Sequence, residues 1–211
     1  MQNHEEFRHP GLEALRTLMP PHEGAGDGVD WADAEREWGT RFPHDYMAFM
    51  SEYGEGGISD FLQVLQPFST AYDKSVHGMH FETENARGFV TEVTGPDDLR
   101  ASSTAPLIAW GVTSGPDIPC RQTTDDDPER WPVVVIGRHT SSSVTRYNVG
   151  MTEFLKRVIL TDFEERPLSG LDLWGAESPK FLHRQEEKRL WNSGIDPWTG
   201  EADPHAGREW D

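Results

Sequence analysis

Cysteine is almost absent from the sequence: the only one is Cys120, so no disulfide bond can form within the chain. A fold built without disulfides does not depend on an oxidising compartment. Long apolar runs are missing too, and no stretch approaches the roughly 18 residues that would predict a membrane-spanning helix. The opening residues MQNHEEF carry early acids and lack the apolar segment of a signal peptide. We therefore expect a cytoplasmic protein that does not enter a membrane.

Basic residues are scarce: 19 Lys and Arg stand against 37 Asp and Glu, which gives a net charge of −18. Nucleic acids and anionic membranes are bound through Lys and Arg that displace counterions from phosphate groups, so the composition argues against both partners. An acidic surface keeps a protein soluble, but it also attracts a basic protein and raises the rate of their encounter. The charge is concentrated at the start, with −9 over residues 1–60 against −3 over 131–211.

Hydrophobic residues make up only 35 % of the chain, but eight Trp and ten Phe compensate, because each aromatic side chain buries a large area. A length of 211 residues suits one domain with an extension. We divide the chain into a domain over residues 1–165 and a C-terminal extension over 166–211. Three Trp within residues 191–210 predict that the extension docks on the domain.

The N-terminal part predicts two short helices before residue 40. The segment PGLEALRTLMPP (10–21) is expected to be helical until the double proline stops it. Asp30 can cap the second helix, and Gly39 suits the left-handed position at its end. An apolar stripe follows Asp30 at i, i+3 and i+7: Trp31, Ala34 and Trp38. The loop GAGDG (24–28) between them lacks the preceding strand of a phosphate loop and is predicted to be a flexible linker.

A third helix is expected to start at Pro43 and Asp45, which fit the first turn of a helix. Its apolar face is Tyr46, Phe49, Met50 and Tyr53. We expect Tyr46, Phe49 and Met50 to form the seam of two packed helices together with Trp31 and Trp38. Gly54, Gly56 and Gly57 are expected to end the helix and to permit tight turns.

Strands dominate the middle of the chain. The strand segments are ISDFLQVLQPF, PLIAWGVT, DIPCRQTT, PVVVIGR and SSVTRYNV, and a helix follows in GMTEFLKRVIL. Residues 71–105 give no clear pattern beyond a possible short helix in DDLRAS. Helices, then an antiparallel sheet, then a closing helix indicate an α+β fold rather than alternating βαβ units. In the extension, Ser178 and Pro179 are expected to start a helix that ends before Gly194.

Possible catalytic and metal-binding patterns are isolated. His77 and His80 have a metal-like spacing, but a metal site needs three or four converging ligands. The segment RHTSSS (138–143) places a His near serines without the G-x-S-x-G elbow of a serine nucleophile. Glu35 and Asp45 could form a carboxylate pair, although capping and surface roles explain both. Neither a cofactor nor a metal site is predicted.

The acidic loop DDDPE supplies the candidate binding residues Asp125, Asp126, Asp127 and Glu129. It lacks the alternate acids and central Gly of a helix-loop-helix calcium site. We predict a solvated loop whose carboxylates can meet basic groups of a partner protein.

The segment EREWGTRFPHDYMAFMSEYGEGG (35–57) resembles the motif of the SUKH superfamily, which includes the Smi/Knr-type proteins. The motif is an acid on a helix, a Gly four residues on, an apolar residue before Pro, then Asp-Tyr, an apolar pair and glycines. Its residues here are Glu35, Trp38, Gly39, Phe42, Pro43, Asp45, Tyr46, Phe49, Met50 and Gly54. Phe42 replaces the usual Leu. The later segments PLIAWGVTSGPD, WPVVVIGR and MTEFLKRVIL also fit, so the resemblance covers about residues 10–162.

The resemblance implies helices around an antiparallel sheet without a catalytic site. Bacterial members of the superfamily act as immunity proteins that neutralise polymorphic toxins, often nucleases, by binding them, and a fungal branch serves as a regulatory scaffold. We therefore expect a non-enzymatic protein that binds a basic partner, and the leading hypothesis for this partner is a nuclease-type toxin domain. A scaffold for another cellular protein is the alternative, and a metal-assisted hydrolase using His77 and His80 is a third hypothesis.

Overall fold

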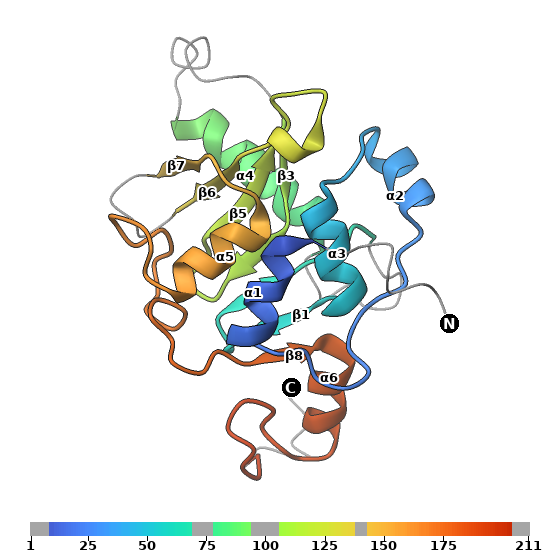
Figure 1. Cartoon of the computed structure of the whole chain (residues 1–211), viewed down its shortest axis with the longest axis vertical. Coiled ribbons are helices and arrows are strands. Elements are labelled where there is room, and N and C mark those ends of the chain that lie inside the picture. Colours follow the sequence, from blue (N-terminus) through green and yellow to red (C-terminus); the bar gives the residue numbers. More distant parts are fainter. Residues whose placement is uncertain (1–8, 69–77, 94–105, 138–142, 204–211) are drawn as a thin grey trace.

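The computed structural model describes residues 9–68, 78–93, 106–137 and 143–203. These residues form an α+β fold, as the sequence predicts, with helices around two antiparallel sheets (Figure 1). The helices are α1 (Pro10–Leu18), α2 (Trp31–Trp38), α3 (His44–Glu52), α4 (Met79–Val93), α5 (Met151–Ile159) and α6 (Arg184–Asn192), with a short 3-10 helix η2 (Pro128–Arg130). Among these described helices, none has the length and apolar character needed to cross a bilayer.

Each sheet has four strands. Sheet A has the order β4-β2-β1-β8, and sheet B has the order β3-β5-β6-β7. The strands are β1 (Gly56–Ile58), β2 (Leu62–Val64), β3 (Leu107–Ala109), β4 (Gly111–Thr113), β5 (Ile118–Gln122), β6 (Val133–Ile136), β7 (Val144–Tyr147) and β8 (Phe181–His183). Trp110 joins β3 to β4: its N–H donates to Pro119 O at 3.0 Å, and its carbonyl accepts from Leu65 N at 3.0 Å. The two sheets therefore meet through one chain segment.

Sheet B is covered on both faces. α4 contacts β3, β5 and β6 on one face, where Val134 and Ile136 join a cluster with Ala86. Val133 and Val135 point the other way, into the main core that includes α5. In Figure 1, α4 lies behind this sheet and α5 lies in front of it. The unbroken apolar run of β6 follows from this arrangement, because a strand buried on both faces needs no polar alternation.

The helix α4 is the element that the sequence patterns missed, since residues 71–105 gave no clear prediction. Met79 and Ala86 are buried on its inner side, but so is the polar Thr83. The Thr83 hydroxyl accepts a hydrogen bond from Ala109 N at 3.0 Å, which satisfies the buried polar group and interrupts the apolar stripe. The short helix expected in DDLRAS lies outside the described residues.

The expected helix ends around the motif are confirmed. The Asp30 carboxylate accepts from Asp33 N at 3.0 Å and so caps α2. Gly39 takes the left-handed conformation with φ 67°, and Gly54 does so after α3 with φ 78°. Pro43 is the residue just before α3 rather than its first residue.

The expected seam between α2 and α3 is only partly right. Trp31 contacts Tyr46 with a ring-centroid distance of 5.9 Å, so the two helices meet near the start of α3. Phe49 instead stacks on Tyr53 at 4.6 Å. Both rings also meet Phe181 of β8 edge-on, at 5.9 and 5.2 Å. The far end of α3 therefore packs on the C-terminal extension.

The extension supplies the edge strand of sheet A. β8 pairs antiparallel with β1, with Gly57 opposite Leu182. The prediction of a helix starting at Ser178 and Pro179 is wrong, because this segment leads into β8. α6 begins only at Arg184, where the ring of His183 accepts from Gln185 N at 3.1 Å and caps the helix. Pairing with β1 overrides the local helix signal.

Gly56 and Gly57 lie in strand β1 and not in the expected turn. A Cβ on Gly56 would strike Leu182 O and the Phe181 ring, and a Cβ on Gly57 would lie 2.7 Å from Cζ2 of Trp198. These glycines are needed because β8 and Trp198 approach the backbone of β1 closely. The GAGDG loop is likewise attached: Gly26 N donates to Tyr53 O at 3.1 Å, and Asp27 N donates to Met50 O at 2.8 Å.

Candidate binding surfaces

The acidic loop after β5 is held together by its own side chains. The Asp125 carboxylate accepts from Asp127 N at 2.9 Å, and the Asp127 carboxylate accepts from Glu129 N at 3.2 Å, which caps η2. Arg130 lies 3.6 Å from Asp125 and 3.7 Å from Asp127. The Trp131 indole donates to Asp125 O at 2.7 Å. The loop is therefore a fixed turn and not a loose acidic segment.

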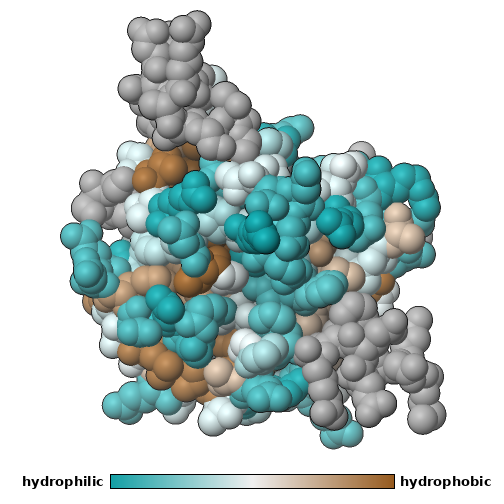
Figure 2. Space-filling view, turned by 45° about the horizontal axis from the view of Figure 1, so that its top comes forward, coloured by the Kyte–Doolittle hydropathy of each residue, from teal (hydrophilic) through white to brown (hydrophobic). Residues whose placement is uncertain are grey.

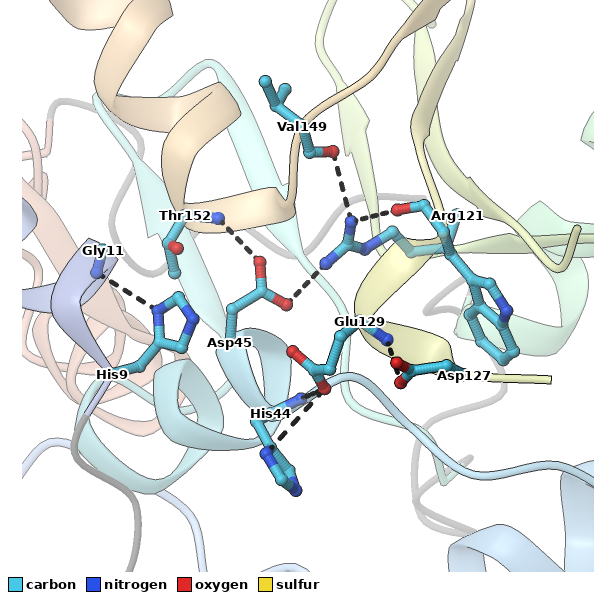
Figure 3. Close-up of polar contacts among 10 residues, drawn as sticks. His9, Gly11, His44, Asp45, Arg121, Asp127, Glu129, Val149 and Thr152 are labelled. Carbon is cyan, nitrogen blue, oxygen red and sulfur yellow. Dashed lines mark hydrogen bonds and ion pairs between the residues drawn. The ribbon is translucent and has the colours of Figure 1, made fainter. Parts of the chain in front are cut away.

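Two contacts attach this loop to the motif segment. Glu129 Oε1 accepts from His44 N at 2.7 Å (Figure 3), so it caps the first turn of α3. The Arg41 guanidinium donates to Asp126 O at 2.9 Å. The side chain of Asp126 is exposed and makes no hydrogen bond or ion pair with any described residue. Of the four predicted binding carboxylates, it is the one free to meet a partner.

A buried ion pair lies beside the loop. Asp45 and Arg121 are joined at 2.5 Å, and their side chains are only 3 and 5 % exposed. Arg121 also donates to Trp131 O at 2.7 Å, and Asp45 accepts from Thr152 N at 3.2 Å (Figure 3). The motif aspartate thus joins α3, β5 and α5. Glu35 is half-buried on α2 and is not among its partners, so the suggested carboxylate pair is not formed.

A second polar cluster connects the extension to the GAGDG loop. His183 Nδ1 accepts from Gln185 N, so its proton is on Nε2, which donates to Asp27 Oδ1 at 3.1 Å. His22 Nε2 accepts from His183 N at 3.2 Å. Asp27 Oδ2 accepts from Glu55 N at 2.7 Å. The backbone N–H and both ring nitrogens of this buried histidine are therefore engaged, and they connect β8 to His22, to Asp27 and to the start of α6.

Asp27 makes the attachment of the extension sensitive to acid. Burial alone would raise the pKa of Asp27, but the hydrogen bonds from His183 and from Glu55 N outweigh it and lower the pKa below its ordinary value. A carboxylate with a lowered folded-state pKa stabilises the fold above the unfolded-state pKa of about 3.9. That contribution is lost as the pH falls through the folded-state pKa.

We therefore expect the stability gap between the protein and an Asp27→Asn variant to be full at pH 6 and to shrink below about pH 4. Urea unfolding at several pH values measures it. Burial is the largest cause that raises the pKa of Glu55, and the charge of Asp27 adds to it. The effect of burial is common to both proteins and cancels in the difference, so only the smaller coupling between Glu55 and Asp27 remains. Asp33→Asn, at an exposed side chain on α2, is the matched control. A gap that stays constant from pH 6 to pH 3 would contradict the assignment.

A groove of about 270 Å³ crosses the outer face of sheet A. Its floor includes Gly57, Gln63 and Val112, which are cross-strand neighbours in β1, β2 and β4. Asp60, in the turn between β1 and β2, and Glu187 and Trp198 of the extension are also part of the lining. The groove is therefore bounded partly by sheet A and partly by the extension.

The remaining predicted residues do not converge on a site. His80 lies on α4, stacks on Trp38 at 4.0 Å and is 2.6 Å from Glu37. His77 and His139 lie outside the described residues. Cys120 is fully buried, and burial raises the pKa of its thiol far above the ordinary value, so it is not a reactive thiolate. Within the described part of the chain, no group of three His, Cys, Asp or Glu could hold a metal ion.

The sequence does not predict the groove residues Asp60, Glu187 and Trp198. One signal was available: two consecutive glycines after α3 are unusual in a strand and indicate that something lies close to the backbone. The Trp-rich extension is the element that does so. Nothing local, however, indicates that residues 57 and 198 meet.

Comparison of the chain with protein-family models, with curated proteins and with solved structures finds no match in any of the three. The resemblance to the SUKH superfamily therefore stays a prediction that rests on the motif residues.

Proposed function

We propose that this protein is a non-enzymatic binding module of the immunity type, which neutralises a basic toxin domain by covering its active site or substrate channel. One observation carries the proposal: the acidic loop is held rigidly on the motif scaffold, and the Asp126 carboxylate is left free at the surface. The net charge of −18 adds a long-range attraction for a basic partner. The SUKH-like motif supplies the family analogy, which supports a function without proving one.

The fixed geometry of the loop favours binding. A partner that meets a loop already ordered by Asp125, Asp127 and Arg130 does not have to order it, which lowers the entropic cost of association. Hydrophilic residues also cover most of the face shown in Figure 2, with hydrophobic residues in patches between them. Charge complementarity therefore suits this surface better than a broad apolar contact. An immunity protein acts in the cytoplasm, and a chain with one cysteine suits that reducing compartment.

The direct test is co-expression with the toxin-like protein encoded beside this gene. Cells that express both proteins should survive, and the two should copurify as a stoichiometric complex. Unchanged toxicity together with the absence of a complex would overturn the proposal.

Within such a complex, Asp126→Lys is expected to slow association about three- to ten-fold at low salt and to weaken its salt dependence, because a rim charge acts mainly on the encounter rate. Stopped-flow association at several salt concentrations measures both effects. Glu177→Lys, at an exposed site on the extension, changes the charge equally and serves as control. The melting temperature should not change, since the Asp126 side chain caps nothing. Equal association rates for Asp126→Lys and Glu177→Lys would show that the acidic loop is not part of the interface.

A further inference from the structure

Two carboxylates, those of Asp60 and Glu187, line the groove on sheet A. Burial and then the nearby Asp196 and Asp172 raise the pKa of Asp60. Burial is the largest cause that raises the pKa of Glu187, and the charge of Asp60 adds to it, whereas hydrogen bonds from Trp198 and Trp191 and the charge of Arg184 lower it. Two carboxylates that repel each other across a groove are stabilised by a cation placed between them.

Two cations lie near the groove, and each also has another partner. The ammonium of Lys180 donates to Pro197 O at 2.7 Å and lies 6.0 Å from the centre of the Trp198 ring. The guanidinium of Arg184 donates to Glu55 at 3.1 Å. Neither residue lines the groove.

Trp198 gives the groove an aromatic wall. Its indole N–H donates to Glu187 Oε1 at 3.3 Å, so the ring and the carboxylate are held side by side. The ring is half-buried and lies against Gly57. A carboxylate next to an indole face is the combination that a guanidinium uses, because it can pair with the first and stack on the second.

The turn that carries Asp60 is strained. Ser59 and Asp60 have φ values of 52° and 53°, and tight hairpins of this kind normally use Asn-Gly. Residues other than glycine are strained in this conformation, and such strain is found preferentially at functional positions. Asp60 therefore places a carboxylate at the groove in a position that glycine would occupy with less strain.

We propose that this groove binds the guanidinium side chain of an arginine in an extended segment of a basic protein, between Asp60, Glu187 and Trp198. The volume of about 270 Å³ lies just below the range of roughly 300–1,000 Å³ for small-molecule pockets, which suits a single side chain. That the protein carrying this arginine is a toxin rests on the proposed function. The binding of an arginine side chain in the groove does not depend on the proposed function.

The test is a titration of the full chain with a blocked Gly-Arg-Gly peptide, followed by NMR of the Trp198 indole N–H, which is assigned with a Trp198→Phe variant. We expect a saturable shift with the arginine peptide. The same peptide with citrulline, a neutral isostere of arginine, should give none.

Glu187→Gln keeps an acceptor for Trp198 and removes the charge, so it should weaken arginine-peptide binding about ten-fold or more. Asp60→Asn should weaken it as well, and it leaves the hydrogen bond between Trp198 and Glu187 in place. Glu186→Gln, on the same helix and paired with Arg189, is the matched control and should bind as the unchanged protein does.

Any of three results would contradict the proposal that the groove binds arginine: no shift with the arginine peptide, an equal shift with the citrulline peptide, or unchanged affinity in both Glu187→Gln and Asp60→Asn. The titration contains no toxin, so it is independent of the immunity proposal. A shift without toxin neutralisation would support arginine binding in the groove and contradict the immunity role. Neutralisation without any shift would support the immunity role and contradict arginine binding in the groove.

Discussion

Replacement of Asp45 by alanine is expected to lower the free energy of unfolding by about 3–5 kcal/mol. The change leaves the guanidinium of Arg121 buried without its carboxylate, since the two side chains are 3 and 5 % exposed and 2.5 Å apart. It also removes the acceptor for Thr152 N. A charge left unpaired in a buried site costs far more than a surface ion pair contributes.

Equilibrium unfolding in urea, with the midpoint and the slope compared between proteins, measures the loss. Arg36→Ala is the matched control, because it breaks the exposed ion pair with Asp33 on α2 and should change stability by less than about 1 kcal/mol. The double variant Asp45→Ala, Arg121→Met should recover much of the loss, since no unpaired charge remains. A loss below about 1 kcal/mol for Asp45→Ala would show that Arg121 finds water or another partner.

Gly56→Ala is expected to destabilise the protein by about 2–3 kcal/mol and to release the extension. The new methyl group would press on Leu182 O and on the Phe181 ring. Backbone atoms of a paired strand cannot move aside without breaking the ladder between β1 and β8. The loss should therefore appear both in the unfolding midpoint and as faster proteolysis of the segment after residue 165.

Gly88→Ala provides the opposite control with the same chemical change. Gly88 is an exposed position of α4 where a Cβ would meet nothing, and alanine in a helix is more favourable than glycine by about 0.5–1 kcal/mol. The two substitutions should thus change stability in opposite directions. Similar effects from both would mean that β8 is not closely packed on β1.

The parts of this fold that the sequence predicts are those with a local physical cause. Asp30, Gly39 and Gly54 signal helix ends through capping and left-handed backbone, and the structure has helix ends at all three. The strand in PVVVIGR is equally local, because β-branched side chains favour extended backbone. These signals were sufficient for the α+β class and for most elements up to residue 160.

The parts that could not be predicted depend on distant partners. Ser178 and Pro179 carry a helix-start signal, but β1 offers an unpaired edge and the segment extends to pair with it. The sequence predicts the acidic loop only as a run of charge. The hydrogen bonds that Asp125, Asp127 and Glu129 accept show that three of its four carboxylates serve the fold. The groove needs residues of β1 and of the extension to meet, and no local pattern describes that.

The pairing of β8 with β1 also has a consequence for the order of folding. Arg184 and Glu55, joined where these strands meet, are 129 residues apart along the chain. Closing so long a loop costs on the order of 4 kcal/mol of chain entropy before the contacts compensate it, and such distant pairings form slowly. During synthesis, β1 therefore exposes its free hydrogen-bonding edge until the segment beyond residue 180 has left the ribosome. Nascent chains in that interval are expected to be the form most prone to pair with one another.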